Sequence, residues 1–111
     1  MKAYLRCALF LVCWYSLAPA YRARDGIFEL IVCPAGKESP RKSEGAVQAL
    51  KDGSLLLAYT EFFAGDSSDW GAARINGKIS RDNGRSWSQP FTMVANQGRM
   101  NVMAASLLRL G

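Results

Sequence analysis

The residues whose spacing is most specific for chemistry lie in the stretch SRDNGRSW, at positions 80–87. Asn and Gly tolerate positive φ, so Asp82-Asn83-Gly84 predicts a tight hairpin turn. The oxygens of Ser80 and Asp82 can exchange hydrogen bonds with the backbone of that turn, and the Trp87 ring can cover it. No nucleophile is paired with a base here. We therefore expect this stretch to stabilise its hairpin through internal hydrogen bonds and to have no catalytic role.

The amino-acid composition argues against several other kinds of functional site. The 111 residues include no histidine, which excludes a Ser-His-Asp triad and histidine metal sites within the chain. The acidic residues are scattered and do not form a calcium loop. The net charge is +5, and it falls to +3 without Lys2 and Arg6. Since no basic run is present, we expect no nucleic-acid partner. Without histidine or clustered acidic residues we also expect no metal, and we expect no cofactor.

The stretch at 80–87 resembles the Asp box, S-x-D-x-G-x-T-W, of sialidases and related BNR-repeat β-propellers. Ser80, Asp82, Gly84 and Trp87 match, and Ser86 keeps the hydroxyl of the usual Thr. Two further segments, SEGAVQALKDGSLLLAYTEF and NVMAASLLRL, resemble the first hairpin and the opening of the second blade in secreted bacterial sialidase-like proteins. The resemblance implies an all-β fold, namely the first blade and the start of the second in a propeller that usually has six blades.

The elements that must position these residues follow from the apolar patterns and turn signals. Predicted strands cover 27–32, a hairpin within 46–62 that turns at Asp52-Gly53, 73–80 and 91–95. Gly77 interrupts the third of these and predicts a bulge or a close neighbour. Predicted loops cover 34–45, 63–72 and 96–101. The segments ALKDG and LLRLG repeat at an offset of 58 residues, which is compatible with four-stranded blades.

The N-terminus reads as a secretory signal peptide. Lys2 and Arg6 precede an apolar stretch at 7–17, and APA at 18–20 predicts cleavage after Ala20. We therefore expect a secreted or periplasmic protein with no stable membrane insertion. The alternative is an uncleaved membrane anchor. Residues 21–26 are expected to be a flexible start, and 27–111 the partial propeller. Cys33 would then be single and would serve as a small buried apolar residue.

The resemblance also implies a catalytic site. In sialidases three arginines bind the substrate carboxylate, an Asp is the acid/base, and a Tyr with a Glu supplies the nucleophile. The acid/base belongs to the loop at 63–72, where Asp69 is the candidate and Asp66 the alternative. Trp70 is next to Asp69, and a ring can remove a carboxyl group from water and so favour its acid form. The competing interpretation is a turn-forming Asp in a Ser/Gly loop.

Four residues are candidates for substrate binding. The family's RIP motif is absent, and its place falls near Ser43 or Glu44. Arg41, two residues earlier, can replace its arginine after a loop shift. Glu44 would put a carboxylate at this place, which suits a neutral or hydroxyl-rich sugar, unless it is a solvated loop residue. Arg74 can face the site or a neighbouring blade, and Asn101 can bond a sugar hydroxyl.

Together these features predict the N-terminal fragment of an exported sialidase-like glycoside hydrolase. When full length, it would remove terminal sugars by exo-α-sialidase-type cleavage. The Tyr nucleophile, its Glu and two arginines would lie downstream, so we expect the chain alone to be inactive. Its partners would be carbohydrate or glycoconjugate and the remaining blades. The alternative is a non-catalytic carbohydrate-binding or adhesion propeller. A third reading is a small all-β binding domain complete in itself.

Overall fold

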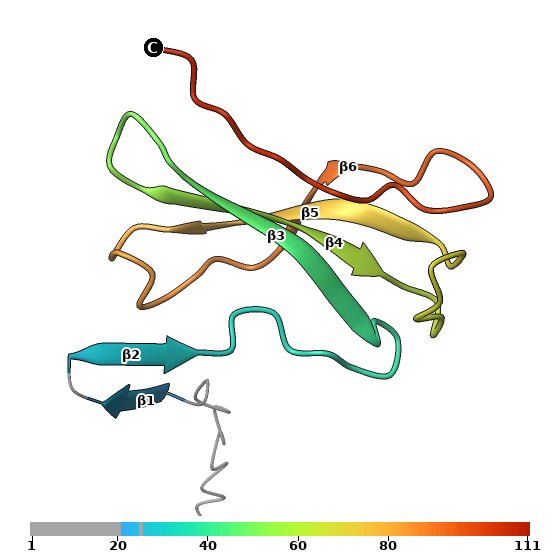
Figure 1. Cartoon of the computed structure of the whole chain (residues 1–111), viewed down its shortest axis with the longest axis horizontal. Coiled ribbons are helices and arrows are strands. Elements are labelled where there is room, and N and C mark those ends of the chain that lie inside the picture. The colour runs from blue at the N-terminus through green and yellow to red at the C-terminus, as the bar shows by residue number, and fades with distance from the viewer. Residues whose placement is uncertain (1–20, 25) are drawn as a thin grey trace, which may run out of the picture.

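The computed structural model describes residues 21–24 and 26–111 (Figure 1). The predicted signal peptide at 1–20 lies outside these residues. The described chain contains strands and no helix, so the prediction of an all-β fold is confirmed, and no helix there could span a membrane. The strands are β1 (Tyr21–Arg24), β2 (Ile27–Leu30), β3 (Arg41–Ala49), β4 (Leu55–Phe62), β5 (Ala73–Ser80) and β6 (Phe91–Val94).

The strands form two separate antiparallel sheets. β1 pairs with β2, and β3, β4, β5 and β6 follow one another in an open four-stranded sheet. The turn between β3 and β4 is the predicted one. Gly53 has φ 84°, and the Asp52 carboxylate accepts hydrogen bonds from Ser54 N at 3.0 Å and Ser54 Oγ at 2.6 Å. These bonds close the turn locally, as the Asp-Gly pair predicts.

β3, the first strand of the four-stranded sheet, begins earlier than the sequence predicts. Residues 41–45 were expected in a loop, but β3 starts at Arg41 and pairs there with the end of β4. A shift in register between Ser43 and Ala46 accommodates Glu44, whose φ is 53°. Cross-strand contacts on β4 favour strand here: Lys42 and Ser43 face the polar residues Glu61 and Thr60, and Arg41 faces Phe62. A β-bulge lets the ladder continue past the extra residue.

The N-terminal segment also differs from the expectation. Residues 21–26 were expected to be a flexible start, whereas Tyr21–Arg24 forms a hairpin with β2. Gly26 has φ 79°, which permits the tight return between the two strands. The hairpin lies on one side of the four-stranded sheet (Figure 1).

One face of the sheet, which we call the Thr60 face, carries most of the core. Ala58, Thr60, Phe62 and Ala73 are fully buried on it, and Ile75 is nearly so. The extended segment 101–111 crosses this face. Val102 N donates to Ala73 O at 3.0 Å, Ala104 N to Thr60 Oγ at 3.1 Å, and Arg109 Nη1 to Ala49 O at 3.4 Å. In Figure 1 this segment runs on the side away from the β1–β2 hairpin.

The opposite face, which we call the Tyr59 face, is covered by the connection between β2 and β3. Lys78 Nζ donates to Val32 O at 2.7 Å, and Lys42 Nζ donates to Pro34 O at 2.9 Å. Tyr59 and Glu61 are buried beneath this connection. Two extended segments distant in sequence therefore cover the two faces of a single sheet.

Gly77 has the close neighbour that its sequence context predicts. A Cβ atom at this position would lie 2.7 Å from Phe91 Cζ and 2.8 Å from Met93 Sδ. The β5–β6 register also shifts between Ile75 and Asn76. The missing side chain lets two large β6 side chains lie flat against β5.

Candidate functional site

The two ends of the four-stranded sheet have different roles. The β3–β4 turn and the β5–β6 hairpin lie at one end. The start of β3, the loop 63–72 and Asn101, which bridges to Ala73, lie at the other. β5 has eight residues and separates the two ends by about 25 Å. The hairpin stretch and the candidate site residues are thus at opposite ends of the sheet.

The hairpin at positions 80–87 bonds its own polar groups. Ser80 Oγ donates to Asp82 Oδ1 and accepts from Gly84 N, both at 2.8 Å. Asp82 also accepts from Ser86 N at 2.8 Å and from Ser86 Oγ at 2.5 Å. Trp87 Nε1 donates to Gly84 O at 3.0 Å. The predicted hydrogen bonding within the hairpin is confirmed by these bonds.

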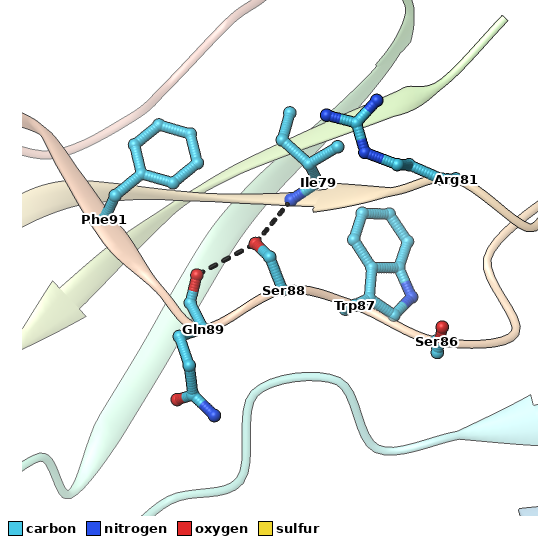
Figure 2. Close-up of a pocket in the computed structure, with 7 residues that line it drawn as sticks. All are labelled: Ile79, Arg81, Ser86, Trp87, Ser88, Gln89 and Phe91. Carbon is cyan, nitrogen blue, oxygen red and sulfur yellow. Dashed lines mark hydrogen bonds between the residues drawn. The ribbon is translucent and has the colours of Figure 1, made fainter.

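The electrostatics of the hairpin agree with a structural role. The hydrogen bonds from Ser86, followed by that from Ser80, lower the pKa of Asp82 to about 2. The carboxylate is thus held in its ionised, accepting form at neutral pH. A hollow of about 590 Å³ lies beside it, with the Trp87 ring between Arg81 and Ser86 (Figure 2). Ser88 Oγ in this hollow already bonds Ile79 N and Gln89 O.

At the opposite end, three of the predicted site residues come together. Arg41 Nη1 donates to Asp69 Oδ1 at 2.5 Å and to Ser67 O at 3.3 Å. Asn101 Nδ2 donates to Asp69 O at 2.5 Å. The Arg41 guanidinium also lies 4.4 Å from the centre of the Phe62 ring. We call Arg41, Asp69 and Asn101 the rim cluster, because they lie at the rim of the sheet.

The rim cluster is open to solvent. The Asp69 side chain is 74% exposed and the Arg41 side chain 32% exposed. Trp70 is itself 74% exposed, so its ring does not remove the Asp69 carboxyl group from water. The expectation that this ring would shield the carboxyl group from water is therefore wrong for this structure. Asp69 instead presents a carboxylate that is paired with a guanidinium and retains open acceptor positions.

Asp66, the alternative acid/base, has a local role. Its Oδ1 accepts from Ser68 N at 2.8 Å, and this backbone bond, followed by the Ser68 side chain, lowers its pKa. A Cβ on Gly71 would lie 2.9 Å from Asp66 Cγ, so the carboxyl group is folded back against the loop. These contacts fit the turn-forming interpretation better than the catalytic one.

Glu44 joins the bulge of β3 to the C-terminal segment. Its Oε2 accepts from Thr60 Oγ and from Ala104 N, each at 3.1 Å. Glu44 and Ala104 both have positive φ, at 53° and 66°. The carboxylate therefore helps to hold the segment that carries Asn101 across the Thr60 face, and it is more than a solvated loop residue.

Arg74 is directed away from the rim cluster. It lies on the Tyr59 face and donates to Glu61 Oε2 from Nε at 2.9 Å and from Nη2 at 2.7 Å. Asn76 Nδ2 donates to the same oxygen at 2.6 Å, and Lys42 Nζ lies 3.7 Å from Glu61 Oε1. Burial alone would raise the pKa of Glu61, but Arg74, and to a smaller extent Ser39 and Lys42, hold it below its usual value.

The sequence reasoning did not find the Glu61 network. Glu61 is only 6% exposed, although it follows an apolar run as the first charge. A carboxylate inside a predicted sheet strand needs a cation on a neighbouring strand, and this is the signal that would have indicated the network. The network joins β3, β4 and β5 near the base of the loop that carries Asp69.

Neither a metal centre nor a reactive thiol is indicated in the part of the chain that the structure describes. No cluster of three or more possible metal ligands occurs among the residues that the structure describes. Cys33 lies beside Tyr59 on a hollow of about 290 Å³. Burial raises the pKa of the Cys33 thiol, with the positive charges of Lys78 and Lys42 opposing it, so the thiol form is favoured.

Searches against family models, curated proteins and solved structures found no match to this chain.

Proposed function

We propose that this chain is part of a sialidase-like β-propeller and that the rim cluster binds carbohydrate. The observation that carries the proposal is the convergence of Arg41, Asp69 and Asn101 at the end of the sheet opposite the Asp-box-like hairpin. In the family that the sequence resembles, ligands bind at the end away from the box. The three residues come from three separate segments, which is how an open binding rim is built.

The proposed blade is supported by the arrangement of the strands. A four-stranded antiparallel meander is the unit of a propeller, and segment 101–111 lies across it as the first strand of a following blade would. Val47, Leu108 and Leu110 are 58%, 82% and 77% exposed. Apolar side chains left this open are what neighbouring blades would cover, because one repeat cannot bury its own faces.

The chemistry of the rim cluster suits hydroxyl-rich ligands. A guanidinium and an amide donate hydrogen bonds, and a carboxylate accepts them, so together they can bond both lone pairs and protons of sugar hydroxyls. The positive charge of Arg41 and the negative charge of Asp69 neutralise each other in one ion pair. The pair thus favours a neutral sugar, unless a ligand carboxylate displaces Asp69 from Arg41.

The first candidate activity is that of an exported glycoside hydrolase that removes terminal sugars. Asp69 is then the acid/base, and the Tyr nucleophile, its Glu and two further arginines come from other blades. The second candidate is a non-catalytic carbohydrate-binding propeller. It is favoured by the ion pair itself, because the exposed Asp69 carboxylate is bonded to Arg41 and can accept further hydrogen bonds from a ligand.

Binding is tested by saturation-transfer NMR on the full chain, with lactose and 3′-sialyllactose as probes. We expect saturation transfer to lactose, which Arg41→Met reduces strongly. Arg81→Met is the matched control, because Arg81 is 79% exposed at the other end of the sheet. Equal transfer in both variants, or none in the native chain, would contradict the proposal.

Hydrolysis separates the two candidates. Because the proposed nucleophile comes from other blades, fluorogenic sialosides and galactosides are incubated with the propeller that carries all of its blades and with its Asp69→Asn variant. Release of the fluorophore that depends on Asp69 supports the hydrolase. Sugar binding without release supports the non-catalytic propeller.

A further inference from the structure

We propose that Trp70 is a sugar-stacking residue: its indole face receives the apolar face of a pyranose ring whose hydroxyls reach Asp69 and Asn101. This inference rests on the proposed carbohydrate site and adds a specificity-determining residue to it. It concerns a side chain that the Asp-box resemblance does not assign.

The first observation is the exposure of the ring. Trp70 is 74% exposed, whereas Trp87, the other described tryptophan, is half-buried and bonds Gly84 O. A large aromatic side chain that remains in water offers much apolar area to a ligand. An exposed aromatic residue next in sequence to a member of a polar cluster is a candidate for ligand contact.

The second observation is that the loop backbone on both sides of Trp70 is anchored by hydrogen bonds. Asn101 Nδ2 donates to Asp69 O at 2.5 Å on one side of it, and Gly71 N donates to Ser68 O at 3.0 Å on the other. The loop base is closed by Phe63 N, which donates to Ala72 O at 3.1 Å. A loop whose backbone is already anchored loses little conformational freedom on binding, which favours affinity.

The third observation concerns the groups next to the ring. Asp69 precedes Trp70 directly and keeps a 74% exposed carboxylate, although it is paired with Arg41. A pyranose ring has one face of C–H groups and an edge of hydroxyls. The indole can pack against the first and the rim cluster can bond the second, so both surfaces of a neutral sugar are satisfied together. A purely apolar partner would cover the exposed Asp69 carboxylate without offering it a further hydrogen bond.

The test uses the full chain with lactose, followed by saturation-transfer NMR and by tryptophan fluorescence. In the native chain we expect lactose to shift the emission to shorter wavelength. Trp70→Ala should weaken binding about ten-fold, and Trp70→Tyr should keep it within about three-fold, because a phenol ring can still stack. Leu110→Ala is the control, since Leu110 is 77% exposed and distant in sequence from the loop. Circular dichroism should show the same fold in all variants.

Each other outcome overturns the inference in a recognisable way. If Arg41→Met abolishes lactose binding and Trp70→Ala does not, the carbohydrate site stands and the stacking role is wrong. If the native chain shows no transfer to lactose or 3′-sialyllactose, both proposals fail. If Trp70→Ala leaves sugar binding unchanged and removes self-association in sedimentation velocity, Trp70 contacts a second copy of the chain instead.

Discussion

Replacing Glu61 by Gln should destabilise the sheet by about 2–3 kcal/mol. Glu61 is 6% exposed and accepts three hydrogen bonds from Arg74 and Asn76 at 2.6–2.9 Å. Hydrogen bonds to a charged group contribute about 1.5–3 kcal/mol each, roughly twice the neutral value. A Gln keeps one acceptor but halves the strength of these bonds. It also leaves Lys42, whose side chain is 13% exposed, without its counter-charge.

The assay is urea unfolding followed by circular dichroism, with Glu29→Gln as the matched control. Glu29 lies exposed on β2, so the same chemical change there should alter the free energy of unfolding by less than about 0.5 kcal/mol. The structural account of the network would be refuted by a Glu61→Gln variant that unfolds at the same urea concentration as the native chain.

The pH dependence supplies an independent check on the same network. The pKa of Glu61 is lower in the folded chain than its ordinary value of 4.5. Its ionised form therefore stabilises the fold above that value, and the contribution is lost as the pH falls through the folded pKa. The difference between the native chain and Glu61→Gln should be full at pH 7 and should shrink below about pH 4.5. A difference that stays constant down to pH 3 would mean that packing, and not charge, is responsible.

Three further changes test other parts of the structure. Asp82→Ala should lower the unfolding midpoint at pH 7, and because the pKa of Asp82 is about 2 instead of 3.8, the difference should fade between pH 4 and pH 2 in a thermal-melt series. Gly77→Ala should cost about 1–2 kcal/mol in urea unfolding, since the new methyl group meets Phe91, and Phe91→Ala should recover part of that loss. Thr60→Val should cost about 1–2 kcal/mol and speed amide exchange at Ala104, because the fully buried hydroxyl bonds both Ala104 N and Glu44. Unchanged exchange at Ala104 would show that the segment is held by other contacts.

The strands and turns were largely predictable because they depend on neighbours in sequence. The span of β5 matches the prediction, and β6 ends one residue earlier than predicted, at Val94. The Asp52-Gly53 turn and the hairpin at 80–87 form the bonds that their residues predict. Each of these bonds joins groups no more than four residues apart, so residue types alone specify them.

The positions of the candidate site residues were less predictable because they depend on register. Successive strand residues point to opposite faces, so one residue decides the side of the sheet. Arg74 follows Ala73 directly, yet Ala73 lies in the Thr60-face core and Arg74 bonds Glu61 on the Tyr59 face. The bulge at Glu44 adds a further shift, which the sequence pattern did not indicate.

The sequence by itself determined the all-β class, the approximate spans of most strands and the self-bonded hairpin. All three follow from local periodicity and turn chemistry. Only the tertiary structure decided that Arg41 reaches Asp69 across 28 positions, that Asn101 holds the same loop, and that Trp70 remains in water. These depend on strand pairing and on the course of segment 101–111 over the sheet. The physical reason is that long-range contacts are set by the packing of whole elements, for which no short stretch of residues carries the information.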